Sequence, residues 1–290
     1  MKNAVAEVAR VLADTETLLV LTGAGISAES GLPTFRGVNG LYDQWPDLTT
    51  VLSADGLARN PQAVWEFINQ FRMHAAAAQP NAAHRLLAQW ERDRRFQRFL
   101  IATQNIDGLH QAAGSQRVAE LHGSAWQIAN PRAREYATDE VFAREFRSLL
   151  AATPDRETLL RRWSEANHRD IWEDREVPFR TIPPYRDPSF RPNVLLFDED
   201  YGDRLLWVQD FISHKPDAVL VIGCSGTLNI LWDLLEDCHR ANPRCRILSV
   251  NADPDTELPD AIHLCGSATE AMQQLAAALG SNRPAPPPEG

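Results

Sequence analysis

Short apolar runs recur near both ends of the chain, and each run ends in small or polar residues. Such runs lie at 18–21, 99–103, 218–222, 246–250 and 261–264. A short continuous apolar run indicates a strand that is buried on both faces, as in a parallel sheet. The intervening segments 228–238 and 269–279 carry apolar residues at helical spacing. This alternation predicts an α/β fold, in which a doubly wound, Rossmann-like parallel sheet is covered by helices on both faces.

The composition narrows the class of protein. A chain of 290 residues has the size of one large domain with a smaller insertion. The net charge of −10 argues against general binding to nucleic acid or to anionic membranes. No apolar run has the length of a membrane span, and the N-terminal residues lack a signal-peptide core, so we expect a cytoplasmic protein. The cysteines, Cys224, Cys238, Cys245 and Cys265, form no C-x-x-C pair and are expected to be free thiols.

A glycine-rich turn follows the first predicted strand. Gly23, Gly25 and Ala28 fit the G-x-G-x-x-G/A spacing, which brings a backbone close to a pyrophosphate at a helix N-terminus. Taken alone, the spacing also fits a simple tight turn. A dinucleotide dehydrogenase would continue into a helix and a second strand, whereas the segment 31–45 is rich in Gly, Pro and aromatic residues. That composition predicts a loop over a ligand.

A second polar group follows the predicted strand at 99–103. Gln104, Asn105 and Asp107 would project from its carboxyl end, where parallel sheets bind ligands. Their amide and carboxylate groups suit a carboxamide and ribose hydroxyls, although a turn in which Asn and Asp bond their own backbone is the alternative. His122 lies further on, and an imidazole beside a ligand is suited to accepting a proton near neutral pH.

These blocks together resemble the sirtuin family. The resemblance rests on the segment 22–36 with its Pro-x-Phe-Arg loop, on the block 103–110, and on Glu-Leu-His-Gly-Ser at 120–124. It covers nearly the whole chain except about 128–185. It implies an NAD-dependent protein lysine deacylase, of deacetylase type, that transfers the acyl group to ADP-ribose and releases nicotinamide. Its partner would be an acylated-lysine protein, with neither nucleic acid nor membrane involved.

The resemblance also implies roles for individual residues. His122 would be the general base, Asn105 and Asp107 would position the nicotinamide end, and Gln104 would position the ribose. Cys224 departs from the family, which usually has Thr there. The implied NAD-binding residues are Gly23, Ala24, Gly25, Ser27, Ala28, Thr34, Phe35, Arg36, Gln104, Asn105, Asp107, Gly223, Ser225, Asn251 and Gly266.

The substrate side departs more from the family. The peptide-binding strand of sirtuins ends Phe-Gly-Glu, and here Val194, Leu196 and Phe197 are followed by Asp198. Because strand addition uses backbone groups, peptide binding is expected; the alternative is that Asp198 narrows the entrance or locks a closed loop. Ile68 and Phe71 stand where desuccinylases of the family have Tyr and Arg. The apolar pair predicts a neutral acyl group, because Phe cannot bind a carboxylate as Arg does; simple core filling is the alternative.

The largest departure is the loss of the two cysteine pairs that bind zinc in most sirtuins. The segments 127–132 and 182–188 carry neither Cys nor His, so no zinc and no other metal is predicted. We expect a small domain at 37–84 and 128–189 that is mainly helical, with amphipathic helices at 138–150 and 155–172. The NAD-binding domain would comprise 1–36, 85–127 and 190–280, and the Pro-rich tail 281–290 would be disordered.

Two other functional classes stay open at this point. An NAD hydrolase or ADP-ribosyltransferase would keep the cofactor side and change the substrate side, as this sequence does. A non-catalytic NAD-binding module would not need the positioned base His122.

Overall fold

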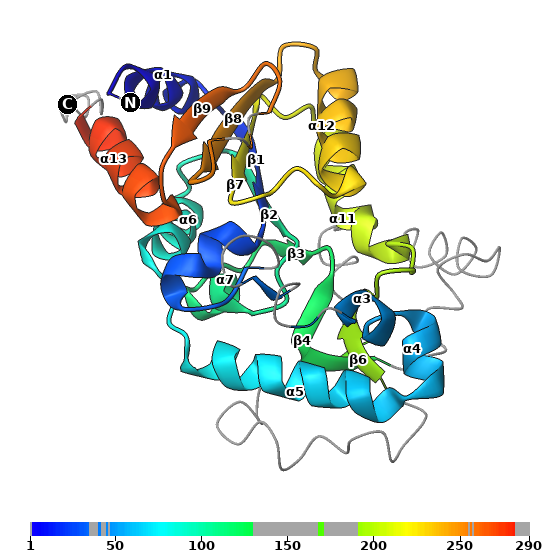
Figure 1. Cartoon of the computed structure of the whole chain (residues 1–290). Helices are drawn as coiled ribbons and strands as arrows, with labels where there is room; N and C mark the ends of the chain where they lie inside the picture. Colours follow the sequence, from blue (N-terminus) through cyan, green and yellow to red (C-terminus); the bar gives the residue numbers. More distant parts are fainter. Residues whose placement is uncertain are drawn as a thin grey trace.

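A parallel sheet of six strands forms the centre of the molecule (Figure 1). The computed structural model describes residues 2–34, 40–41, 45, 47–129, 168–170, 191–254, 256 and 258–281. Across the sheet the strand order is β3-β2-β1-β7-β8-β9. The strands are β1 (Thr17–Thr22), β2 (Arg98–Thr103), β3 (Val118–Glu120), β7 (Ala218–Ile222), β8 (Arg246–Asn251) and β9 (Ile262–Cys265). The predicted α/β class is confirmed, and only β3, with three residues, was too short to be recognised.

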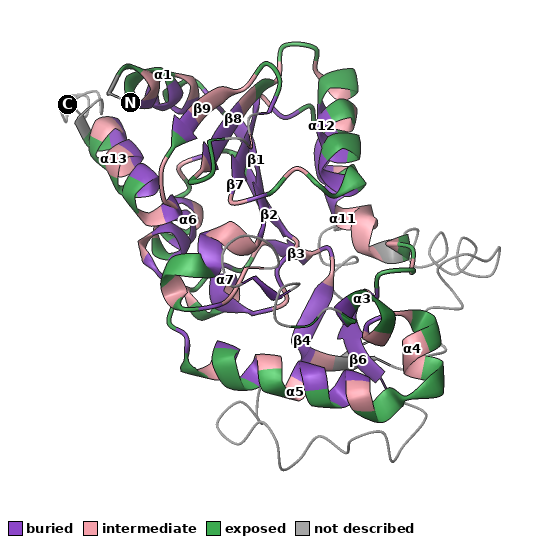
Figure 2. Ribbon diagram, viewed as in Figure 1, coloured by how far each residue is buried: buried purple, intermediate pink, exposed green. Residues whose placement is uncertain are grey.

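Helices cover both faces of this sheet, which explains why its strands are apolar throughout. Leu18 and Val20 of β1 pack into one core, whereas Leu19 and Leu21 pack into another on the opposite face. Both cores are buried in Figure 2. One face is covered by α1 (Lys2–Ala13), α6 (Ala82–Arg92) and α13 (Ala268–Ser281), and the other by α11 (Leu206–Ser213) and α12 (Asn229–Ala241).

A second, smaller unit contains an antiparallel sheet in the order β5-β4-β6. Its strands are β4 (Gly123–Ala129), β5 (His168–Asp170) and β6 (Arg191–Val194), and its helices are α3 (Leu48–Val51), α4 (Ala54–Arg59) and α5 (Pro61–Ala77). Val64 and Ile68 of α5 share a core with Ala125 and Val194 of the small sheet. The expected helix at 155–172 is therefore wrong at 168–170, because pairing with β4 makes those residues a strand. The rest of that helix and the helix expected at 138–150 lie outside the described residues.

The boundaries between the two units differ from the expected ones. The expected boundary between 84 and 85 falls inside α6, whose Ala83 and Leu87 pack into the same large-sheet core. Strands β4 and β6 were expected to lie largely in the NAD-binding domain, but they pair with each other in the small sheet. The tail beyond 281 lies outside the described residues.

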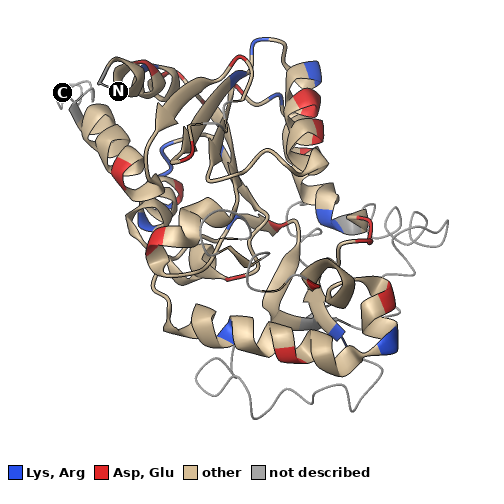
Figure 3. Ribbon diagram, in the orientation of Figure 1, with Lys and Arg blue, Asp and Glu red and all other residues tan. Residues whose placement is uncertain are grey.

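Charged residues lie mostly on the helices and loops, whereas the central strands carry few (Figure 3). Among the helices that the structure describes, none is long and apolar enough to span a membrane.

Candidate active site

A cavity of about 540 Å³ lies at the carboxyl ends of the parallel strands, beside the small unit. It opens between the neighbouring strands β1 and β7. The next strand after β1 lies on one side of this pair and the next strand after β7 lies on the other, and ligands usually bind where the strand order reverses in this way. The predicted residues that line it are Gly23, Ala24, Gly25, Ala28, Thr34, Ile68, Phe71, Gln104, Asn105, His122, Val194, Leu196, Phe197, Gly223, Ser225, Asn251 and Gly266. Most of the predicted site therefore converges on one cavity. Phe35 and Arg36 lie outside the described residues.

The glycine-rich turn is locked against the loop after β7. The amide of Gly23 donates to the carbonyl of Ile222 at 3.0 Å. A Cβ on Gly23 would lie 2.7 Å from the carbonyl oxygen of Gly223. Gly223 itself has a φ of +64°. The close contact between these two loops thus requires the glycines of the G-x-G motif, whether or not a ligand also requires them. The 3-10 helix η1 (Ala24–Ser30) begins here: the amides of Gly25 and Ile26 donate to the carbonyls of Gly223 and Gly23, and the first two residues of η1 line the cavity.

The loops after β7, β8 and β9 are also joined to one another. Asn251 donates from its side chain to the carbonyl of Cys224 at 2.8 Å, and its own carbonyl accepts from the amide of Gly266 at 2.9 Å. Ser225 and Thr227 add hydroxyl groups, 2.8 Å apart, to the same wall. This end of the cavity is therefore formed by backbone groups and small polar side chains.

Asn105 is fixed by a buried network behind the cavity wall. Its Nδ2 donates to the carbonyl of Gly23 at 3.1 Å and to Ser27 Oγ at 3.2 Å. Ser27 in turn donates to Asp107 Oδ2 at 2.7 Å, and Asp107 Oδ1 accepts from the amide of Leu109 at 2.8 Å. Because both amide protons are used, Asn105 Oδ1 is left as the acceptor for a ligand. Ser27 and Asp107 do not line the cavity; they orient Asn105.

Two further buried histidines extend this network, and the sequence interpretation missed them. Nδ1 of His84 lies 3.1 Å from Asn81 Oδ1, and Nε2 of His110 lies 3.0 Å from Thr22 Oγ1. Burial lowers the pKa of His84 to about 4, and it lowers the pKa of His110 well below its usual value. Both rings are therefore neutral at physiological pH and act as structural groups.

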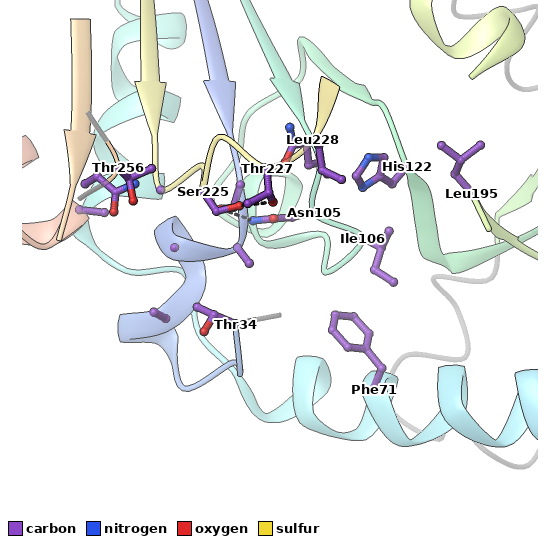
Figure 4. A pocket seen from close by; sticks show the side chains of 18 of the residues that line it. Thr34, Phe71, Asn105, Ile106, His122, Leu195, Ser225, Thr227, Leu228 and Thr256 are labelled. Atoms are coloured by element: carbon purple, nitrogen blue, oxygen red, sulfur yellow. Dashed lines mark hydrogen bonds between the residues drawn. The ribbon is translucent and has the colours of Figure 1, made fainter. Parts of the chain in front are cut away.

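His122 lies in the turn between β3 and β4, where it faces the cavity (Figure 4). Its Nε2 is 3.0 Å from the Tyr201 hydroxyl, and the ring also hydrogen-bonds the backbone of Gln104. Burial, reinforced by the positive charge of Arg204, lowers the pKa of His122 to about 4. The imidazole is therefore neutral near pH 7 and can accept a proton.

The end of the cavity near α5 is apolar. Ile68 and Phe71 lie there with Ile106, Val194 and Leu196. Figure 4 shows Phe71 and Ile106 on the same side of the cavity as His122 and Leu195. Among the described lining residues there is no Lys or Arg.

The next residue, Arg72, is buried outside the cavity. Its guanidinium lies 5.2 Å from the centre of the Trp126 ring, and Arg72 is not among the residues that line the cavity.

Asp198 does not line the cavity, contrary to the idea that it narrows the entrance. Its Oδ1 accepts from the amide of Ala54 at 2.6 Å, at the start of α4. The amide of Phe197 donates to the carbonyl of Leu52 at 2.9 Å. The end of β6 is thus fastened to the segment 52–54.

Comparisons with known proteins agree with this geometry. The model of the Sir2 family matches residues 23–229. The NAD-dependent protein deacylase 2 of Archaeoglobus fulgidus is 48% identical over 276 residues, covering 95% of this chain and 96% of the relative. A solved structure described as "Structural Basis for the Mechanism and Regulation of Sir2 Enzymes" is 31% identical, with a TM-score of 0.72, covering 98% of this chain and all of the other.

A second solved structure, of Sir2Af2 bound to a myristoylated histone peptide, is 27% identical, with a TM-score of 0.65. It covers 97% of this chain and 98% of the other. The extent of these matches shows that the chain belongs to the Sir2 family, the sirtuins.

Proposed function

We propose that this chain is an NAD-dependent protein lysine deacylase that transfers the acyl group to ADP-ribose. One observation carries the proposal: a single cavity joins the glycine-rich loops to an apolar end, and His122 and Asn105 lie between the two (Figure 4). A nucleotide needs the first end, an acyl-lysine side chain needs the second, and the transfer between them needs a base. The names of the Sir2 relatives support the same activity.

The residues of the first end suit NAD. Gly23, Ala24 and Gly25 would let a pyrophosphate come close to the backbone, and the cavity of about 540 Å³ is of the size that holds a cofactor. The adenosine half of NAD would be held by Ser225, Asn251 and Gly266. The central part of NAD would be surrounded by Ala24, Ala28 and Thr34. NAD supplies the ribose carbon from which nicotinamide departs and to which the acyl oxygen becomes attached.

His122 and Asn105 would then do the chemical work of the chain. Asn105 Oδ1 would accept from the carboxamide of nicotinamide and so orient the leaving group. Gln104 lines the wall between them and would contact the ribose. His122, neutral because it is buried, would take the proton of a ribose hydroxyl as general base.

The substrate would be a lysine that carries a neutral acyl chain. Ile68 and Phe71 offer apolar contact in the part of the cavity where Val194 and Leu196 also lie. A carboxylate on the acyl group would lose its hydration there and gain no partner among the described lining residues. Ile68 is only 1% exposed and also belongs to the core of the small unit, so the proposal rests mainly on Phe71, which is less deeply buried and lines the cavity.

We also propose that the small unit holds no structural zinc. All four cysteines of the chain lie between 224 and 265, far from the segments where the family's cysteine pairs would fall. Burial raises the pKa of Cys224 and of Cys245 to about 12, so these thiols stay protonated and bind metals poorly. Stoichiometric zinc in the purified protein, measured by atomic emission, would contradict this part of the proposal.

The deciding experiment is mass spectrometry of the products formed from NAD with and without a panel of acyl-lysine peptides. O-acyl-ADP-ribose should appear only with peptide, and it should be lost in His122→Ala. Free ADP-ribose and nicotinamide formed equally without peptide would instead make the chain an NAD hydrolase. In that case the attachment of Phe197 and Asp198 to the segment 52–54 is the feature to examine first.

A further inference from the structure

The hydroxyl of Tyr201 lies within hydrogen-bond distance of a ring nitrogen of His122. The distance from Tyr201 Oη to His122 Nε2 is 3.0 Å, and the ring centres lie 5.7 Å apart. Both side chains line the cavity. Tyr201 stands after β6, immediately before the 3-10 helix η4 (Gly202–Leu205), and nothing in the sequence marked it as part of the site.

The structure holds Tyr201 firmly in this position. Its ring packs with Leu205 and Trp207 against the core beneath α11 and α12. The amide of Arg204 donates to the Tyr201 carbonyl at 3.2 Å, and Nη2 of Arg204 donates to Asn193 Oδ1 at 2.6 Å. The backbone of Tyr201 is thus linked through Arg204 to the small sheet that His122 adjoins.

The hydrogen-bond roles in this pair follow from the charges around it. The ring of His122 hydrogen-bonds the backbone of Gln104, and its Nε2 faces the Tyr201 hydroxyl. A neutral imidazole has one nitrogen with a free lone pair, and we assign that role to Nε2. Burial, with the negative charge of Asp233 adding to it, raises the pKa of Tyr201 to about 12. The phenol therefore keeps its proton and donates it to Nε2. On the side of His122 the charged neighbour is Arg204; Glu120, which interacts with Arg204, is titratable but protonated at pH 7.

We propose that Tyr201 is a proton-relay residue that connects the cavity to His122. The inference rests on the proposed function and deepens it. As a ribose hydroxyl is activated, its proton passes to the Tyr201 oxygen while the phenolic proton passes to His122 Nε2. Tyr201 ends the step unchanged, and the proton is held on the imidazole. The base of this site is accordingly the pair, and the hydroxyl also fixes the tautomer of His122.

The kinetic test compares Tyr201→Phe with the matched control Trp207→Phe, which truncates a neighbouring aromatic ring that does not line the cavity. Formation of O-acyl-ADP-ribose should fall about 100-fold in Tyr201→Phe, the lower end of what a proton-transfer group contributes. Exchange of labelled nicotinamide into NAD in the presence of peptide precedes the base-dependent step. It should stay within about 2-fold of wild type in both variants, because no proton-transfer group acts before that point.

A spectroscopic test needs neither NAD nor peptide. In ¹⁵N-histidine spectra, with His122→Ala used for assignment, Tyr201→Phe should raise the pKa of His122 by about half to one unit. The direction follows because the phenol donates to the neutral ring and so favours that form. The acid limb of the kcat profile should move to higher pH by the same amount.

Three results would overturn the relay. Unchanged product formation in Tyr201→Phe would show that the phenol takes no part in the proton transfer, and faster product formation would show that it blocks the base. A parallel fall in product formation and nicotinamide exchange, with a lower Tm, would make its role only structural. An unchanged pKa of His122 in Tyr201→Phe would show that the hydrogen bond between the two side chains does not influence the base. Wild-type protein that forms no O-acyl-ADP-ribose would instead refute the proposed function, and the titration would still test the pair.

Discussion

The backbones of Gly25 and Gly223 are in direct contact, although the two residues are 198 positions apart in the chain. The amide of Gly25 donates to the carbonyl of Gly223 at 3.0 Å, and a Cβ on Gly25 would lie 2.7 Å from the Gly223 Cα. A Cβ on Gly223 would lie 2.4 Å from the amide nitrogen of Ile26. The loops after β1 and β7 therefore define each other's shape and, with it, the nucleotide end of the cavity.

Gly223→Ala should destabilise the protein by about 3 kcal/mol or more. The φ of +64° disfavours any side chain, and the new methyl group meets backbone that cannot move aside. Urea unfolding followed by circular dichroism measures the loss. Gly280→Ala is the control, because its Cβ meets nothing within 4 Å and it lies in α13, where Ala favours the helix by up to about 1 kcal/mol. Equal stability of the two variants would contradict the loop contact.

Phe71→Arg should shift the acyl preference toward acidic groups. A guanidinium in the apolar end of the cavity would pair with a succinyl carboxylate, and we expect kcat/KM for succinyl-lysine relative to acetyl-lysine to rise about 10-fold or more. Met73→Arg is the control, since Met73 is 55% exposed and does not line the cavity. A wild-type protein that already prefers succinyl-lysine would refute the neutral-acyl proposal.

Glu199→Ala should destabilise the protein far more than Glu236→Ala. Glu199 pairs with Arg191, and the two side chains are only 15% and 9% exposed; Glu199 also accepts from the amide of Leu196 at 2.8 Å. Removal of one partner leaves a buried charge, at a cost of about 3–5 kcal/mol. The pair of Glu236 with Arg240 is 72% and 66% exposed and is worth at most about 1 kcal/mol. Chemical unfolding gives both values, and similar losses would show that the first pair is not desolvated.

Glu120→Gln should remove a pH dependence of stability between pH 7 and 8. Burial raises the pKa of Glu120 to about 8, with Arg204 acting in the opposite direction. Between the unfolded pKa near 4.5 and this value the folded state binds the extra proton, so stability falls as pH rises, by about 1.4 kcal/mol per unit at most.

The buried histidines do not obscure this test, because their lowered pKa values affect stability mainly below about pH 6.5. Urea unfolding at pH 7 and pH 8 should therefore show a loss for wild type and a flatter response for the Gln variant, which keeps the bond from Gln111. The same slope in both proteins would mean that Glu120 is ionised at pH 7.

The sequence predicted the parallel sheet well because its signal is local. Residues 218–222 form a strand with the predicted limits, and they are apolar throughout because helices cover both faces. The prediction failed at 168–170, where three residues became a strand only by pairing with β4, which lies about 40 residues earlier in the chain. Secondary structure that depends on a distant partner leaves no periodic pattern of its own.

For the site, the sequence by itself determined which chemical groups are present and that they follow strand ends. It could not separate the residues that face the ligand from those that support them. Ser27 and Asp107 looked like ligand contacts, but hydrogen bonds within the fold place them behind Asn105. Tyr201 looked like an ordinary loop residue, and only the packing of η4 against the small sheet brings its hydroxyl to His122. Burial and partnership across the chain are properties of the tertiary structure, because they depend on which surfaces meet.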